Sequence, residues 1–262
     1  MTLHQQALHP QVRIRAADAG GSGTVIYSQK ADDGFYSTLI LTCHHVVEKN
    51  INVKDDWDSV LKKQKKRESL TPVVVEFFNW DSVPHGKAPL THGTTGDIVA
   101  YSQKHDIALV HLRLREKPPV AKLLPPGKVE DVIIGSEVVI VGCALLHDPI
   151  MTRGSVTHQG DLIDGMDYWM SDAQIIFGNS GGAAFAHLNG GYYFIGIPSR
   201  IDIAGWSAPV THLGYFSPVP RIYKFFREQM YEFLIPGSKK TEAECLDELE
   251  KRRELEEKKL YE

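Results

Sequence analysis

The chain has 262 residues, a formal net charge of -4, and 42% hydrophobic and 24% charged residues. This is the composition of an ordinary soluble globular protein, and its slight negative charge excludes a general attraction to nucleic acid. The first ten residues lack the basic start and apolar run of a signal peptide, and no segment reaches membrane-spanning length. We therefore expect an intracellular or virion-associated protein that binds neither nucleic acid nor membranes.

The three cysteines, Cys43, Cys143 and Cys245, are far apart and odd in number. Neither they nor the histidines show the spacing of metal ligands. We therefore expect free thiols in a reducing compartment, with no disulfide framework, no metal and no cofactor.

From about residue 11 to residue 217, short runs rich in Val, Ile, Tyr and Phe alternate with Gly, Pro, Asp and Asn. These are strand and turn signals, and few helical patterns interrupt them, which disfavours an alternation of strands and helices. The predicted strands, in chain order, are residues 12–16, 23–27, 37–41, 73–78, 98–101, 107–112, 137–141, 155–158, 183–186 and 192–197.

A proline-rich passage at residues 117–127 divides these strands into two comparable halves. The pattern therefore predicts an all-β protein with two packed β-barrels, the first over about residues 11–115 and the second over about residues 130–218. A ligand site would lie in the cleft between them.

Residues 50–69 interrupt the first half with a basic run, KKQKKR, at residues 62–67. The acidic neighbours Asp55, Asp56 and Asp58 argue against a broad cationic face. We expect a solvated insertion here rather than a surface for an anionic partner.

Two helices are expected after the strands. Residues 219–234 predict an amphipathic helix packed on a barrel, because apolar side chains recur mostly at three- and four-residue spacing, namely Ile222, Phe225, Phe226, Met230 and Phe233. Thr241 and Glu244 form a capping-box pattern that opens a charged helix over residues 241–260. This second helix is either solvated or a docking element for a protein partner, since its apolar positions are too sparse for a coiled coil.

Three polar positions in the β region suggest acyl transfer. Ser180 lies among glycines in FGNSGG at residues 177–182, and His45 and Asp106 lie upstream in TCHHV and HDIAL. A serine hydroxyl needs a neighbouring base before it is a good nucleophile, and flanking glycines let backbone N–H groups approach a developing oxyanion. Serine, histidine and aspartate would serve as nucleophile, base and orienting group.

With these motifs the chain resembles a trypsin-like serine peptidase of the chymotrypsin fold, nearer to HtrA/Deg-type protease domains than to secreted digestive enzymes. The likeness rests on GGSGT at 20–24, LTCHHVV at 41–47, DIALV at 106–110 and DAQIIFGNSGG at 172–182. Weaker likeness in VVIVG at 138–142 and GYFSPVP at 214–220 extends it over roughly residues 11–230. The resemblance implies a serine endopeptidase with two six-stranded antiparallel barrels, acting on protein or peptide substrates.

The resemblance also implies an organisation and a set of roles. Residues 1–234 would form the protease domain, residues 235–262 a linker and the charged helix, and too few residues follow Leu234 for the PDZ domain of HtrA/Deg proteins. Ser180 would be the nucleophile, His45 the base and then the acid, and Asp106 the orienting group. His45 is preferred to His44 because the family's catalytic histidine precedes valine. The backbone N–H groups of Gly178 and Ser180 would form the oxyanion hole.

Substrate-binding positions follow from the same likeness. None is acidic, so the resemblance implies a small or medium apolar residue before the scissile bond, bound by Gln174, Ile175, Ile197, Pro198 and Ser199. Pro198, which has no N–H, departs from the family pattern on a strand expected to pair with the substrate. Asn179 replaces an aspartate that in many digestive relatives pairs with a newly released α-amino group, so activity without N-terminal cleavage is expected.

Two alternatives stay open at this point. The segment GNSGG also fits the nucleophile elbow of α/β-hydrolases, with Asp202 and His212 downstream as the acid and the base. The other alternative is a catalytically weak, peptidase-fold binding or structural protein in a larger assembly.

Overall fold

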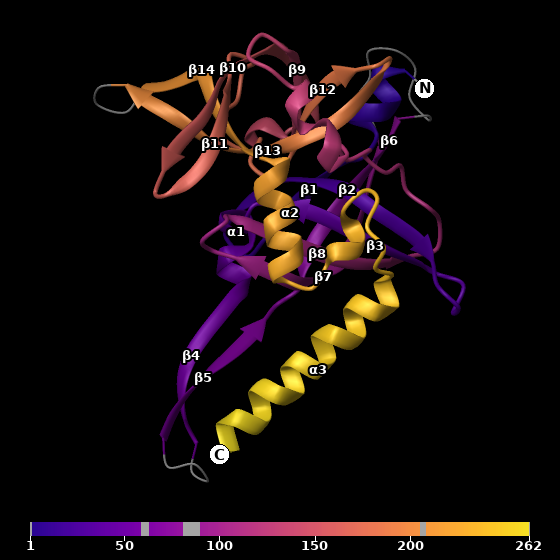
Figure 1. Ribbon diagram of the computed structural model, residues 1–262, viewed down its shortest axis with the longest axis vertical. Helices are drawn as coiled ribbons and strands as arrows, with labels where there is room; N and C mark the ends of the chain where they lie inside the picture. Colours follow the sequence, from indigo (N-terminus) through magenta and orange to yellow (C-terminus); the bar gives the residue numbers. More distant parts are fainter. Residues whose placement is uncertain (1, 59–62, 81–89, 205–207, 262) are drawn as a thin grey trace.

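The computed structural model describes residues 2–58, 63–80, 90–204 and 208–261, and it is built around two closed six-stranded antiparallel β-barrels (Figure 1). The first barrel has the strand order β1-β2-β3-β8-β7-β6 and the second has the order β10-β11-β14-β13-β12-β9. The predicted all-β, chymotrypsin-like fold with C-terminal helices is confirmed. The strand–helix alternation required by the α/β-hydrolase alternative is absent from the described residues.

The ten predicted strands are all present, most of them longer than predicted, and the strands at residues 166–171 and 208–218 were not predicted. The first barrel is formed by β1 (Gln11–Arg15), β2 (Gly20–Lys30), β3 (Tyr36–Thr42), β6 (Val73–Asn79), β7 (Leu90–Ser102) and β8 (Ile107–Leu114). The second is formed by β9 (Glu137–Gly142), β10 (Ile150–Ile163), β11 (Met166–Ser171), β12 (Ala183–Leu188), β13 (Gly191–Ala204) and β14 (Ala208–Pro218). Branched and aromatic side chains favour these pleated surfaces, and closing each barrel pairs the edges that an open sheet would expose.

Each barrel encloses large apolar side chains that exclude water. Ile40 and Leu109 are fully buried in the first barrel, and Phe185, Phe194 and Phe216 are fully buried in the second. The proline-rich connector also packs on the second barrel, where the Leu124 N–H donates to the Phe194 carbonyl at 3.0 Å.

The insertion at residues 50–69 is a two-stranded antiparallel hairpin, β4 (Ile51–Asp58) and β5 (Lys63–Leu70), which projects from the first barrel (Figure 1). Its Trp57 is 62% exposed, consistent with a solvated arm. The sequence did not predict its strands because charged residues are depleted in typical strands and here outnumber the apolar ones. Residue 62 of the basic run lies outside the described residues.

The predicted helix at residues 219–234 is shorter than expected. α2 (Val219–Glu228) ends at Glu228, and a short 3-10 turn, η6 (Glu232–Leu234), follows. Met230 has a φ of 62°, a left-handed conformation that cannot continue a helix. The apolar face of α2 is buried as predicted, with Ile222, Phe225 and Phe226 fully inaccessible. The remaining short helices are η1 (His4–Leu8), α1 (His44–Val47), η2 (Glu48–Asn50), η4 (Pro126–Asp131) and η5 (Ala144–Leu146).

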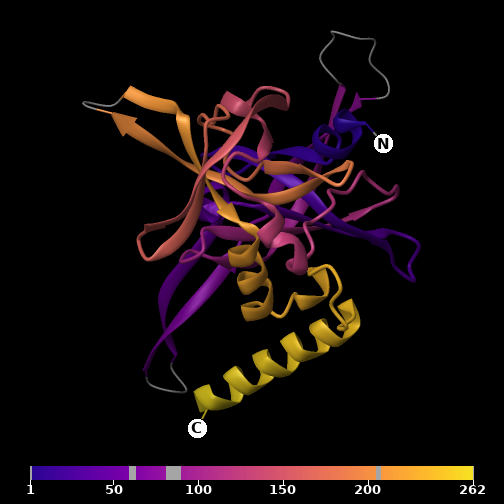
Figure 2. The same cartoon turned by 45° about the horizontal axis from the view of Figure 1, so that its top comes forward.

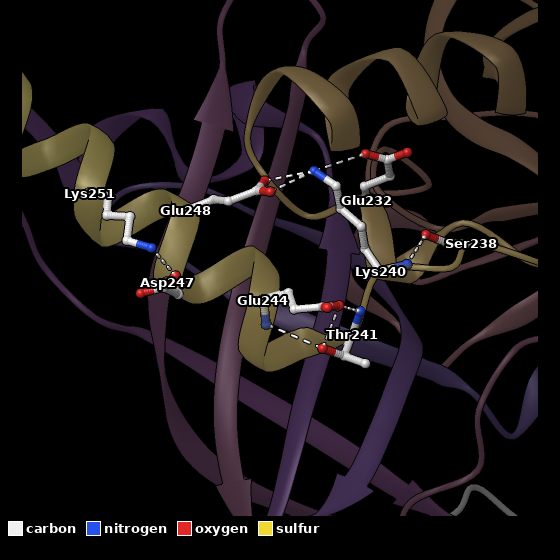
Figure 3. Close-up of polar contacts among 8 residues, drawn as sticks. All are labelled: Glu232, Ser238, Lys240, Thr241, Glu244, Asp247, Glu248 and Lys251. Carbon is white, nitrogen blue, oxygen red and sulfur yellow. Dashed lines mark hydrogen bonds and ion pairs between the residues drawn. The ribbon is translucent and has the colours of Figure 1, made fainter.

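The charged tail forms α3 (Glu242–Tyr261), which lies against the first barrel and extends beyond it (Figures 1 and 2). The predicted capping box is confirmed: the Thr241 N–H donates to Glu244 Oε2 at 2.8 Å, and the Glu244 N–H donates to Thr241 Oγ1 at 3.3 Å (Figure 3). Glu242 anchors the first turn by accepting hydrogen bonds from Tyr27 and Ser37 of the barrel. Among the described helices, none has the length and apolarity to cross a membrane.

Candidate active site

His45 and Asp106 meet because two neighbouring strands end and begin at the same place. β3 and β8 pair antiparallel, with Thr42 opposite Ala108. His45 follows the end of β3 and Asp106 precedes the start of β8. The pairing therefore brings the two side chains together at one end of the first barrel.

The contact between His45 and Asp106 is bidentate. His45 Nδ1 lies 2.9 Å from both carboxylate oxygens, and the His45 backbone N–H donates to Oδ1 at 3.0 Å. An ionised carboxylate only accepts hydrogen bonds, so Nδ1 must carry the proton. This leaves the Nε2 lone pair of a 42%-exposed ring available as a base, while the Asp106 side chain is only 14% exposed.

Ser180 comes from the second barrel, in the loop that enters β12. The Ser180 carbonyl accepts the N–H of Ser22 in β2 at 2.8 Å, and the Ser22 carbonyl accepts from Thr42 Oγ1 at 2.8 Å. These two hydrogen bonds tie the serine loop to the strand that leads to His45. Within the described residues, however, Ser180 Oγ makes no hydrogen bond to His45.

The turn before Ser180 is held by two backbone hydrogen bonds. The Asn179 N–H donates to the Ile176 carbonyl at 3.1 Å, and the Leu145 N–H donates to the Phe177 carbonyl at 2.7 Å. The Phe177 carbonyl and the Gly178 N–H belong to the same peptide. Because the C=O and N–H of a trans peptide point in opposite directions, the Gly178 N–H points away from Leu145. Across the described part of the chain, neither this N–H nor that of Ser180 has an internal acceptor. The loop thus offers two backbone donors to a ligand.

Glycine is required at position 178. Its φ is 93°, and an added Cβ would lie 2.5 Å from the Cys143 carbonyl oxygen and from the Leu145 nitrogen. Asn179 braces the same turn from inside, since it is 1% exposed and its Oδ1 accepts the Ile176 N–H at 3.1 Å. The neutral amide therefore holds this loop without an ionic partner.

Comparisons with known proteins show to which family the chain belongs. The trypsin-like peptidase domain family matches residues 21–197, a stretch that includes His45, Asp106 and Ser180. The chain belongs to this family. Over 151 residues it is 32% identical to the serine protease HTRA1 of Xenopus tropicalis, a match that covers 54% of this chain and 30% of that protein.

Two solved structures show the same fold. A serine endoprotease from Yersinia pestis superposes with a TM-score of 0.59 at 17% identity, covering 89% of this chain and 65% of that one. An HtrA-type protease solved with a tripeptide gives a TM-score of 0.59 at 18% identity, with coverages of 90% and 63%. The chain thus spans 30% of the curated relative and less than two thirds of these solved chains.

In this trypsin-like domain the five expected substrate-binding residues differ in accessibility. Gln174 is exposed, Ser199 is 9% exposed, Ile175 is 2% exposed, and Ile197 has no accessible surface. The buried Pro198 contributes its carbonyl, which accepts the Gly181 N–H at 3.1 Å. The Ser199 hydroxyl is buried and has no hydrogen-bond partner among the described residues. Only part of the expected set therefore offers side-chain surface to a ligand.

Cys43 lies next to the His45–Asp106 pair, and the sequence predicted it only as a free thiol. Its ligand atom and those of His45 and Asp106 lie within 4.8 Å of one another. Burial, reinforced by the Asp106 charge, raises the pKa of Cys43 well above its usual value, and Sγ lies 3.5 Å from the Pro198 carbonyl. Its complete burial, with Sγ facing a backbone carbonyl, fits a packing role.

His105, the residue before Asp106, connects the dyad to α2. It is 1% exposed, its Nε2 lies 2.8 Å from Glu228 Oε2, and its carbonyl accepts from Arg221 at 2.5 Å. Its Nδ1 has no partner among the described residues. Helix α2 therefore braces the turn that carries Asp106, a contact between residues more than 100 positions apart in sequence.

The pKa of His105 makes stability depend on pH. Burial lowers this pKa, although the Glu228 carboxylate opposes the shift. Since an unfolded histidine titrates near pH ~6.5, the unfolded chain binds more protons below that pH, and acidification favours unfolding. Burial also lowers the pKa of His44 and of His111. We therefore expect the urea midpoint of unfolding to be lower at about pH 5.5 than at about pH 7.5.

His105→Gln should reduce this fall, because glutamine does not titrate. His212→Gln, which changes an exposed histidine, is the control and should leave the pH dependence unchanged. Equal pH dependence in wild type and His105→Gln would contradict the role given to His105.

Proposed function

We propose that this chain is a serine endopeptidase that hydrolyses protein or peptide substrates through an acyl-enzyme intermediate. The observation that carries the proposal is the pairing of His45 with Asp106. Next to this pair, the Ser180 loop is tied to β2 and offers two backbone N–H groups that have no acceptor among the described residues. Membership of the trypsin-like family, with residues 21–197 matched, supports it.

The proposed reaction uses each group at one atom. Ser180 Oγ attacks the substrate carbonyl carbon while His45 Nε2 takes the hydroxyl proton, and the backbone N–H groups of Gly178 and Ser180 stabilise the oxyanion. Collapse of the intermediate breaks the C–N bond, and His45 returns the proton to the leaving amine. A water molecule then attacks the acyl-enzyme ester through the same steps and regenerates Ser180. Asp106 keeps the proton on Nδ1 and stabilises the imidazolium without taking that proton.

We further propose a small or medium apolar residue before the scissile bond. Ile175 lies against Gly214, where an added Cβ would be 2.5 Å from the isoleucine Cδ1. This bulk leaves little room for a long side chain, and none of the five expected substrate-binding residues is acidic, which disfavours lysine and arginine.

A second candidate function is a peptidase-fold binding protein with weak turnover. The observation that favours it is the missing Ser180–His45 hydrogen bond among the described residues. In proteases without substrate this bond is often long and tightens when substrate binds, so the geometry is also compatible with an enzyme.

A fluorophosphonate probe tests the choice, because it reacts with an activated serine. We expect the intact mass of the wild-type chain to increase by one probe group, and Ser180→Ala to remain unlabelled with an unchanged circular dichroism spectrum. Ser69→Ala, at an exposed serine of β5, is the matched control and should label like wild type. Absence of labelling and of peptide cleavage in the wild-type chain would favour the binding protein.

A further inference from the structure

The connection between β9 and β10 holds two leucines in a backbone conformation that suits glycine and asparagine. Leu145 has a φ of 51° and Leu146 a φ of 61°. In this left-handed region the Cβ of most residues is crowded by the backbone. The loop is fixed by its surroundings: Arg13 Nη1 donates to the Leu146 carbonyl at 2.8 Å, and Ser22 Oγ accepts the Cys143 N–H at 2.6 Å.

The side chains of Leu145 and of Phe177, which lies in the serine loop, are both large, apolar and exposed. Leu145 is 61% exposed and Phe177 is 63% exposed. The two residues are direct backbone neighbours, since the Leu145 N–H donates to the Phe177 carbonyl at 2.7 Å. That carbonyl belongs to the peptide whose N–H, on Gly178, is a proposed oxyanion donor. Strained residues and exposed apolar groups both concentrate at sites that contact a ligand.

The backbone contact alone does not explain a leucine at position 145. Every residue except proline offers an N–H, and glycine or asparagine would adopt the same φ with less strain. The leucine adds only its side chain, and most of that side chain faces solvent. The strained position is therefore best explained by a use for this apolar surface.

The strand order indicates on which side of the scissile bond this surface lies. Ser180 precedes β12, and β12 is flanked by β13 on one side and β9 on the other (Figure 1). The acyl side of the substrate is proposed to bind along β13. Leu145 follows β9, and the neighbouring Leu146 packs on Gly20 at the start of β2. The exposed pair thus lies on the opposite flank of Ser180, where the leaving amine must exit.

We propose that Leu145 and Phe177 form an apolar subsite for the side chain that follows the scissile bond, so that the substrates are peptides with an apolar residue on the leaving-group side. This inference rests on the proposed peptidase activity. Apolar discrimination of this kind is worth roughly tenfold or more in kcat/KM.

Leu145→Asn gives a sharp test, because asparagine tolerates the left-handed conformation while removing the apolar surface. Two peptides that are identical up to the scissile bond and continue with leucine or glycine would be compared with an ester of the same acyl group. We expect wild type to cleave the leucine peptide about tenfold more efficiently than the glycine peptide, and Leu145→Asn to abolish that ratio. Leu162→Asn, at a 75%-exposed leucine of β10, is the control and should keep the ratio.

Leu145→Asn should gain thermal stability although it loses the preference for the leucine peptide. Relief of strain should raise the midpoint of thermal unfolding of Leu145→Asn by roughly 2–4 °C, which a residue needed for packing would not show. The inference would be overturned if wild type showed no preference for the leucine peptide, or if Leu145→Asn kept that preference. In either case, ester hydrolysis by wild type would still uphold the proposed function. Wild-type protein that hydrolyses neither the ester nor the peptides would refute both.

Discussion

Asp106→Asn is expected to lower kcat by about 10⁴ near neutral pH while leaving the fold intact. The asparagine Oδ1 can still accept the His45 backbone N–H, which Asp106 binds at 3.0 Å. The amide nitrogen, however, would donate to Nδ1 and force the ring proton onto Nε2. His45 could then no longer accept the Ser180 proton, although the ring would keep its place.

The kinetics of ester hydrolysis would measure this effect, with circular dichroism and the urea midpoint confirming the fold. Asp18→Asn, at an exposed aspartate 3.8 Å from Lys49, is the matched control and should keep wild-type kcat. A kcat for Asp106→Asn within tenfold of wild type would show that His45 does not depend on this carboxylate, and the proposed mechanism would have to be abandoned.

Gly178→Ala is expected to lower kcat by about 10² to 10³ through loss of one oxyanion donor. The new methyl group would lie 2.5 Å from the Cys143 oxygen and the Leu145 nitrogen, on a residue with a φ of 93°. The turn must rearrange to relieve this contact, and the rearrangement removes the Gly178 N–H from its outward orientation. For an ester substrate, which does not reach Leu145 and Phe177, binding away from the carbonyl should change little and KM should stay nearly constant.

Gly165→Ala is the matched control for Gly178→Ala. Gly165 has a φ of 72°, but no atom of the described residues lies within 4 Å of an added Cβ, so alanine there carries backbone strain without a collision. It should lower stability by about 1 kcal/mol and leave kcat unchanged. An equal loss of kcat in both variants would indicate a general effect on folding rather than the removal of a donor.

Some features followed from local sequence because local physics fixes them. The capping box of Thr241 and Glu244 joins residues three positions apart, and both of its hydrogen bonds are present in α3. The strand runs, such as residues 107–112 within β8, follow from β-branched and aromatic content. α2 was predicted two turns too long because its apolar periodicity continues past Met230, whose left-handed φ no spacing pattern reports.

The sequence by itself determined the double barrel, the family likeness, and the order of His45, Asp106 and Ser180, since these depend on runs and motifs of a few residues. Only the tertiary structure showed which contacts keep the residues of the candidate site in place. Leu145 meets Phe177, His105 meets Glu228, and Ser22 bridges the Ser180 loop to β3. These contacts join residues far apart in the chain, so strand pairing and barrel closure determine them. The exposed, strained Leu145, on which the proposed subsite rests, was found only in the tertiary structure for the same reason.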